Sequence, residues 1–198
     1  MRFIRRDRQS WRARGLLLKA AAVIGALSTL ASLRVKAGVP TEYQVKAAYL
    51  YNFARFVQWP TKGKTNAGAS FPVCVLGIDP FGRALDRLIA GQAIDGMNVI
   101  ALRISTPEQA ANCRVLFISS SEDDALNNVI STLGRLSVLT VSDMPQFIER
   151  GGMVGFILQN NRVRFEVNLA ATKSAGLTLS SQLLKLAASV KGLDQSGG

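Results

Sequence analysis

Histidine is absent from this chain of 198 residues, and cysteine occurs only twice. Without histidine, the chain cannot build a Ser-His-Asp or Cys-His nucleophilic site and lacks the commonest metal ligand. Two cysteines are too few for a thiolate zinc cage, and they lack the C-x-x-C spacing of thiol–disulfide exchange proteins. These shortages point to a binding or regulatory protein rather than an enzyme. We expect this protein to hold neither a metal nor a cofactor.

A glycine pattern typical of phosphate-binding loops lacks the residues that would carry the chemistry. Gly77 and Gly82 have the right spacing and follow an apolar run. Arg83 and Ala84, however, replace the loop's lysine and hydroxyl residue, and Pro80 removes a backbone N–H. We therefore interpret residues 77–84 as an ordinary strand-to-helix turn.

Three consecutive acids, Glu122-Asp123-Asp124, are the remaining candidate for a metal site. They are predicted to lie in the first turn of a helix, where carboxylates offset the positive end of the helix dipole. A metal is not needed to explain them.

Net charge is low outside the first 37 residues. Residues 1–37 hold nine of the 24 Lys and Arg residues and one of the 13 acids, which leaves a net charge of only +3 for the rest. A nucleic-acid-binding domain needs a basic patch of its own. We therefore expect no nucleic-acid partner.

Residues 1–37 have the organisation of a signal peptide that is cleaved after about Ala37. An arginine-rich start precedes the apolar run 20–33, which is shorter than the roughly 20 residues of a spanning helix. An uncleaved membrane anchor is the alternative, and Arg5-Arg6 leaves twin-arginine export open. We expect an exported domain over residues 38–198, with no membrane insertion after cleavage. An oxidising compartment permits a disulfide between Cys74 and Cys113, and two buried thiols are the alternative.

Apolar runs alternate with helix signals along residues 38–198. The runs 71–78 and 113–119 are typical of strands covered on both faces. Helices are expected from Asp79 as N-cap and from Ser180 or Ser181. The last helix would bury Leu183, Leu186, Ala187 and Val190. The pattern predicts an α/β three-layer sandwich, with a mainly parallel sheet of five to six strands and helices on both faces.

The end of the predicted sheet is an antiparallel hairpin. Residues 153–159 and 162–168 are the two strands on either side of an Asn-Asn turn. In the second strand one side is apolar, and the other carries Arg162, Arg164 and Glu166. This charged row is either a solvated face that discourages strand addition or the rim of a contact with a partner.

Six aromatic residues lie between positions 43 and 59, in a helix expected to begin at Thr41 and end before Pro60. Thr41 and Gln44 have the spacing of a capping box. Core packing at helical spacing accounts for Val45, Tyr49, Phe53 and Phe56. The three aromatics that lie partly off this stripe are either further core or an apolar surface for a partner. We expect an interface at these three: Tyr43, Tyr51 and Trp59.

The segment Glu42–Pro60, EYQVKAAYLYNFARFVQWP, resembles the opening of the YfiR-like periplasmic proteins. Further segments agree in order and spacing, and the resemblance covers essentially the whole chain after the leader. These segments are Val73–Gly77, Gly151–Gly155, Arg164–Leu169 and Leu179–Ala187.

The resemblance implies a dimeric periplasmic repressor that docks on the periplasmic region of an inner-membrane diguanylate cyclase and lowers cyclic di-GMP synthesis. An OmpA-like outer-membrane lipoprotein can sequester such a repressor. Cys74 and Cys113 match one cysteine pair of the family. Ile148 and Gly155 replace a second pair, and Thr178 and Ser180 replace an Arg and a His of a ligand pocket. Redox sensing through that second pair and the ligand pocket therefore do not carry over.

Two other functions stay open. One is a periplasmic small-molecule sensor that serves a histidine kinase or a nutrient receptor, and the other is a carboxylate-based enzyme.

Overall fold

The computed structural model describes residues 39–60, 70–134 and 136–192. The expected signal peptide, residues 61–69, residue 135 and the tail 193–198 lie outside the described residues. The described residues from Pro40 onward form one compact unit. None of the helices in these residues is long and apolar enough to cross a membrane.

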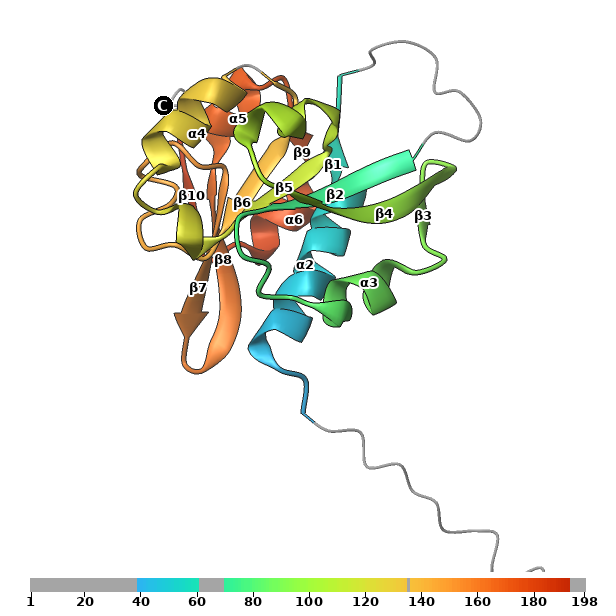
Figure 1. The fold of residues 1–198 in the computed structure, drawn as a ribbon. Coiled ribbons are helices and arrows are strands. Elements are labelled where there is room, and N and C mark those ends of the chain that lie inside the picture. The colour runs from blue at the N-terminus through green and yellow to red at the C-terminus, as the bar shows by residue number, and fades with distance from the viewer. Residues whose placement is uncertain (1–38, 61–69, 135, 193–198) are drawn as a thin grey trace, which may run out of the picture. The chain divides into compact units, whose positions relative to one another are not determined.

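Eight strands form the main sheet, in the order β10-β8-β7-β6-β5-β2-β4-β3 (Figure 1). Neighbouring strands are parallel except for the pairs β7–β8 and β3–β4. The strands are β2 (Ser70–Leu76), β3 (Ala93–Ile94), β4 (Met97–Ile104), β5 (Val115–Ile118), β6 (Leu139–Ser142), β7 (Val154–Gln159), β8 (Arg162–Asn168) and β10 (Ser189–Lys191). The prediction of five to six strands misses β3 and β10, because edge strands this short carry no periodic pattern.

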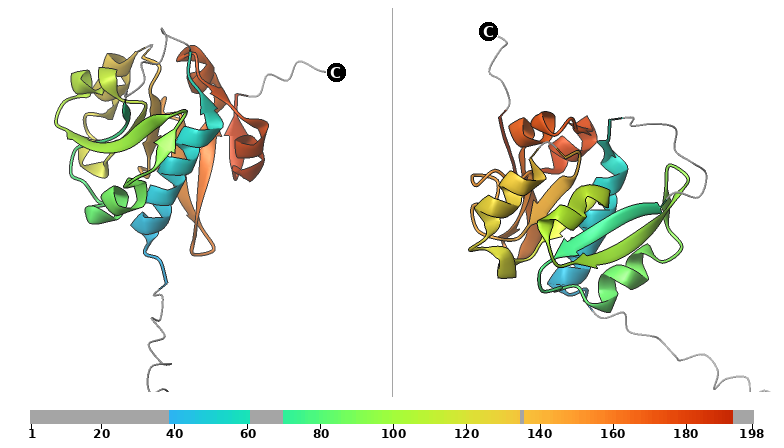
Figure 2. Two further views of the ribbon diagram at one scale, coloured as in Figure 1. Left: turned by 90° about the vertical axis from the view of Figure 1, so that its right-hand side faces the viewer. Right: turned by 45° about the horizontal axis from the view of Figure 1, so that its top comes forward.

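Helices cover both faces of the sheet, which confirms the α/β three-layer sandwich (Figures 1 and 2). In β2, Val73 and Val75 face one helical layer, whereas Cys74 and Leu76 face the other. The first layer contains α2 (Glu42–Phe56), α3 (Arg83–Ile89) and α6 (Ser181–Leu186), and the second contains the 3-10 helix η1 (Pro107–Asn112) and α4 (Leu126–Leu133). The remaining elements are β1 (Val57–Gln58), which pairs with β9 (Thr178–Leu179), the 3-10 helix η2 (Ser120–Glu122) and α5 (Leu169–Ser174).

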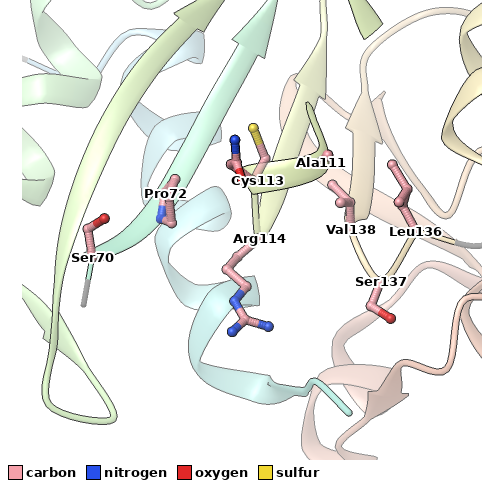
Figure 3. Close-up of a pocket in the computed structure, with 9 residues that line it drawn as sticks. Ser70, Pro72, Ala111, Cys113, Arg114, Leu136, Ser137 and Val138 are labelled. Atoms are coloured by element: carbon pink, nitrogen blue, oxygen red, sulfur yellow. The ribbon is translucent and has the colours of Figure 1, made fainter. Parts of the chain in front are cut away.

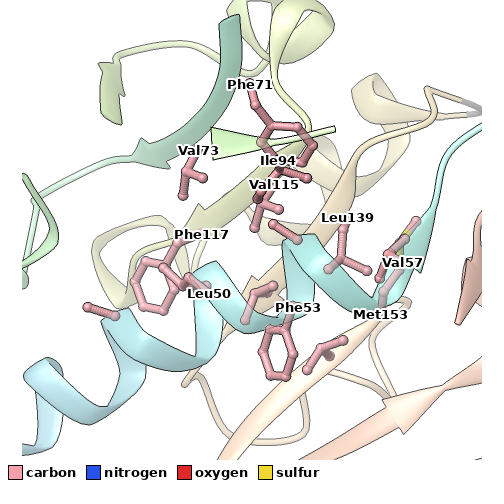
Figure 4. Close-up of a cluster of buried hydrophobic side chains, with 14 of the residues drawn as sticks. Leu50, Phe53, Val57, Phe71, Val73, Ile94, Val115, Phe117, Leu139 and Met153 are labelled. Atoms are coloured by element: carbon pink, nitrogen blue, oxygen red, sulfur yellow. The ribbon is translucent and has the colours of Figure 1, made fainter. Parts of the chain in front are cut away.

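Helix α2 begins as its sequence predicts. Thr41 Oγ1 accepts a hydrogen bond from the Gln44 N–H at 3.3 Å, and Gln44 Oε1 accepts one from the Thr41 N–H at 2.8 Å. The buried face differs from the predicted stripe, because Phe53 is buried whereas Val45, Tyr49 and Phe56 are half-buried. Two alanines allow the helix to lie close to the sheet, and Leu50 and Phe53 point towards Val115, Phe117 and Leu139 (Figure 4). The buried residues of α2 are Lys46, Ala47, Leu50, Phe53 and Ala54.

The C-terminal helix is shorter than predicted. Ser180 is its N-cap and accepts from the Leu183 N–H at 3.2 Å, as expected. The helix ends at Leu186, however, and Val190 lies in β10, paired with Val167 of β8. Leu186 is 60% exposed instead of buried. Pairing with the edge of the sheet outweighs the local helical pattern.

Two other helix starts also differ from the prediction. Asp79 is not an N-cap, because it accepts from the Phe81 N–H at 2.7 Å in a turn and α3 begins only at Arg83. Glu122, Asp123 and Asp124 precede α4, whose first turn contains no acid. Glu122 instead lies in the first turn of the short 3-10 helix η2, and Asp123 and Asp124 lie in the turn between η2 and α4.

Candidate docking surface

The usual ligand position of a doubly wound sheet lies at the carboxyl ends of the strands, where the strand order reverses. The chain leaves β2 towards β4 and leaves β5 towards β6 on the other side, so this position lies between β2 and β5. Gly77 follows β2 with a φ of 85°, and a Cβ on it would lie 2.3 Å from Ser121 Oγ and 2.6 Å from Glu122 Oε1. The Ile78 N–H donates to Ser121 Oγ at 3.0 Å. The chain's own side chains therefore fill the position.

A buried lysine connects α2 to the end of β6 beside this position. Lys46 Nζ lies 2.6 Å from Asp143 Oδ2 and 2.5 Å from Glu42 Oε1. Burial disfavours the charged form of Lys46, but its hydrogen bonds to Asp143 and Glu42 outweigh this cost, so its pKa is raised. No group of three potential metal ligands occurs among residues 39–60, 70–134 and 136–192.

Tyr43, predicted to bind a partner, also belongs to this cluster. Its hydroxyl donates to Asp143 Oδ2 at 3.0 Å, and its ring meets the Phe81 ring edge-on at a centroid distance of 5.5 Å. Burial, followed by the charge of Asp143, raises the pKa of Tyr43. Much of this side chain therefore serves the fold, although the residue is only half-buried.

Tyr51 and Trp59, the other two aromatics predicted at an interface, contact different neighbours. The Tyr51 hydroxyl donates to Gln92 Oε1 at 3.0 Å. The Trp59 ring meets Phe71 edge-on at 5.2 Å, and its buried Nε1 has no hydrogen-bond acceptor among the described residues. Both residues are half-buried against the core. The three aromatics therefore do not share one set of contacts.

The hairpin β7–β8 has the two chemically different faces that the alternation predicts. Phe165 and Val167 are buried and Val163 is half-buried on the face towards α2. Asn160 and Asn161 form the turn with φ values of 52° and 57°. On the other face, Glu166 accepts from Ser189 Oγ at 2.8 Å, which ties this residue to β10.

Arg162 and Arg164 form the charged part of this second face. They line a cavity of about 370 Å³ together with Gln159 and Asn160. Arg164 Nη2 donates only to the Leu186 carbonyl, at 3.4 Å, and no acid of the described residues pairs with either guanidinium. Unpaired guanidinium groups are suited to bidentate binding of a carboxylate.

Exposed leucines lie at the same hairpin and at the helix beside it. Leu186, whose carbonyl accepts from Arg164, is 60% exposed, whereas Leu158, which is 62% exposed near the tip, pairs with Val163 and so lies on the opposite face of the hairpin from the arginines. Arginine together with exposed apolar side chains is a composition that interfaces favour. We call the set on the arginine face and beside it the hairpin surface: Gln159, Asn160, Arg162, Arg164 and Leu186.

Sequence reasoning finds the arginines of the hairpin surface but misses the exposed Leu186. Leu186 is assigned to a buried helix face because the helix is predicted to be too long. The pair Lys46–Asp143 is also missed, since its partners are 97 positions apart and no local pattern connects them.

A disulfide joins Cys74 of β2 to Cys113, which follows η1, with a Cα–Cα distance of 6.0 Å. Cys74 is fully buried and Cys113 is 4% exposed. Both lie in the apolar cluster beneath η1 and α4. The bridge therefore holds the second helical layer to the sheet.

Residues 43–188 match the model of the YfiR/HmsC-like family. Among solved structures, the crystal structure of a conserved domain protein from Vibrio cholerae O1 biovar eltor is similar, with a TM-score of 0.51 and 11% sequence identity. The likeness covers 76% of this chain and 60% of that chain, and it shows the fold alone. Curated protein sequences contain no match to this chain.

Proposed function

The chain belongs to the YfiR/HmsC-like family, and from this premise we propose that it represses an inner-membrane diguanylate cyclase by docking on the periplasmic region of that enzyme. Family membership supports a periplasmic regulator of cyclic di-GMP signalling and a regulatory rather than catalytic role. The match over residues 43–188 is the observation that carries the proposal.

The hairpin surface is the part of the chain that we propose to dock. Its two arginines have no acidic partner among the described residues, so a carboxylate of the cyclase can pair with them without breaking an existing ion pair. Leu186 is exposed beside them and would supply an apolar part of the contact. A homodimer would present two such surfaces, and an OmpA-like outer-membrane lipoprotein would lift repression by sequestering the protein.

A charge reversal on the hairpin surface tests the proposal. In a strain that lacks this protein, the wild-type chain is expected to lower cyclic di-GMP and to crosslink to a transmembrane cyclase in the periplasm. The variant R162E/R164E should be exported at normal levels yet lose both effects. R87E is the matched control, because Arg87 is exposed on α3, away from the hairpin surface.

Three results would contradict parts of this proposal. Repression by R162E/R164E equal to that of the wild-type chain would exclude the hairpin surface as the docking site. Unchanged cyclic di-GMP on removal of the chain would exclude repression itself. Crosslinking to a histidine kinase or a nutrient receptor instead of a cyclase would assign the protein to another signalling system.

A further inference from the structure

A second cavity lies at the amino ends of the parallel strands, the edge opposite to the filled position beside Gly77. Its volume is about 540 Å³, within the roughly 300–1,000 Å³ of small-ligand sites. The residues come from the start of β2, the end of η1 and the segments that enter β5 and β6 (Figure 3). They are Ser70, Pro72, Ala111, Asn112, Cys113, Arg114, Leu136, Ser137 and Val138.

Among the described residues that line this cavity, Arg114 alone is charged. Within the part of the chain that the structure describes, no acid pairs with its guanidinium. Its side chain extends from the start of β5, with Ser70 and Ser137 on either side of it in the view of Figure 3. Arg114 is half-buried, and a guanidinium without a counter-ion favours the binding of an anion.

The backbone of Arg114 is held rigidly. Its N–H donates to the Pro72 carbonyl and its carbonyl accepts from the Leu139 N–H, both at 2.9 Å. The preceding residue, Cys113, also lines the cavity and is joined to β2 by the disulfide. A binding group on such a fixed backbone loses little conformational freedom when a ligand binds.

The chemistry of the other lining residues defines the ligand class. Ser70, Asn112 and Ser137 can hydrogen-bond the oxygens of an anion, whereas Pro72, Leu136 and Val138 offer apolar contact. One guanidinium balances a single negative charge, and the described residues that line the cavity include no second cation for a doubly charged phosphate. We propose that this cavity binds a small monocarboxylate with an apolar body, as an input to the regulator that is separate from the hairpin surface.

Titration of the ¹⁵N-labelled exported domain with benzoate, followed by amide NMR, tests this site. We expect saturable shifts centred on residues 112–114 and 136–138, and none with the neutral analogue benzamide. R114Q should weaken benzoate binding by about tenfold or more, as for a lost charge-assisted hydrogen bond. R114K, which keeps the charge, should lose less, and R162Q should bind as the wild-type protein does. The amide spectrum of R114Q also reports whether that variant is folded.

Several outcomes would overturn the proposal. These are the absence of saturable benzoate shifts, equal binding of benzamide, shifts centred elsewhere, or unchanged affinity in folded R114Q. Inorganic phosphate that binds in preference to benzoate would overturn the assignment to a monocarboxylate. None of these outcomes depends on the docking proposal, because R162E/R164E tests docking in cells and at a different surface.

Discussion

At the scale of single residues, Lys46 is the side chain on which the local structure depends most. It is buried between Asp143 and Glu42, and its Nζ lies 4.5 Å from the centroid of the Tyr43 ring. Removal of one member of a buried ion pair leaves the other charge uncompensated, whereas replacement of both members is often nearly neutral. The stability of this region should therefore depend on the pair being complete.

We predict that K46M lowers the free energy of unfolding by about 3 kcal/mol, since it leaves Asp143 unpaired with only 13% of its side chain exposed. The double variant K46M/D143L should lose less than K46M alone. Urea denaturation measures both. K185M is the control, because Lys185 is exposed on α6 and should change stability by less than about 0.5 kcal/mol. Equal stabilities for K46M and K185M would show that the pair contributes nothing.

The same cluster predicts a loss of stability in alkali. The pKa values of Lys46 and Tyr43 are both raised in the folded state. The folded protein therefore keeps these protons after the unfolded chain begins to lose them, near pH values of about 10 to 10.4. This stabilisation is complete below that range and is lost as the pH rises through the folded pKa values. Urea denaturation at increasing pH should show a smaller decline for Y43F and K46M than for the wild-type protein, and parallel declines would contradict the assignment.

At the scale of elements, the turn after β2 and the turn after β5 depend on one glycine. A Cβ at Gly77 would collide with Ser121 and Glu122, and its φ of 85° is strained for any other residue. We predict that G77A destabilises the protein by about 2 kcal/mol or more, as measured by chemical denaturation.

Two further variants separate the steric effect from the backbone effect at Gly77. G91A has a similar φ of 73°, but nothing lies within 4 Å of the added Cβ, so it should cost only about 1 kcal/mol. G77A/S121A should recover part of the loss, because it removes the hydroxyl at 2.3 Å. Equal losses for G77A and G91A would exclude the close approach as the cause.

Elements with local signals are predicted well from this sequence, and elements that depend on tertiary pairing are not. Thr41 and Gln44 specify the start of α2, and Asn160-Asn161 specifies the hairpin, through contacts between near neighbours in the chain. Val190 appears helical by spacing, but β10 forms because Ser189–Lys191 can pair with β8. The alternation in β8 predicts the face of Arg162 and Arg164, whereas the exposure of Leu186 depends on where the preceding helix ends.

At the scale of the whole molecule, the disulfide links the sheet to the second helical layer. Cys74 and Cys113 are 39 positions apart and both are buried. A closed loop of this length constrains the unfolded chain by about 4 kcal/mol in the chain-entropy model. We expect C74A/C113A to keep the fold but to lose about 2–5 kcal/mol of its free energy of unfolding. Urea denaturation, with a midpoint at lower urea concentration, measures this loss.

The burial of both sulfurs also predicts how the bridge responds to reductants. Thiol–disulfide exchange needs direct access of a thiolate to a sulfur, so the folded protein must open before dithiothreitol can react. Trapping of free thiols over time should show slow reduction in buffer, with a rate that rises steeply with urea and follows unfolding. The protein denatured in urea is the internal control and should be reduced at once. Rapid reduction in buffer, at a rate that scales with reductant and not with urea, would show instead that this bridge is accessible enough to act as a redox switch in the folded regulator.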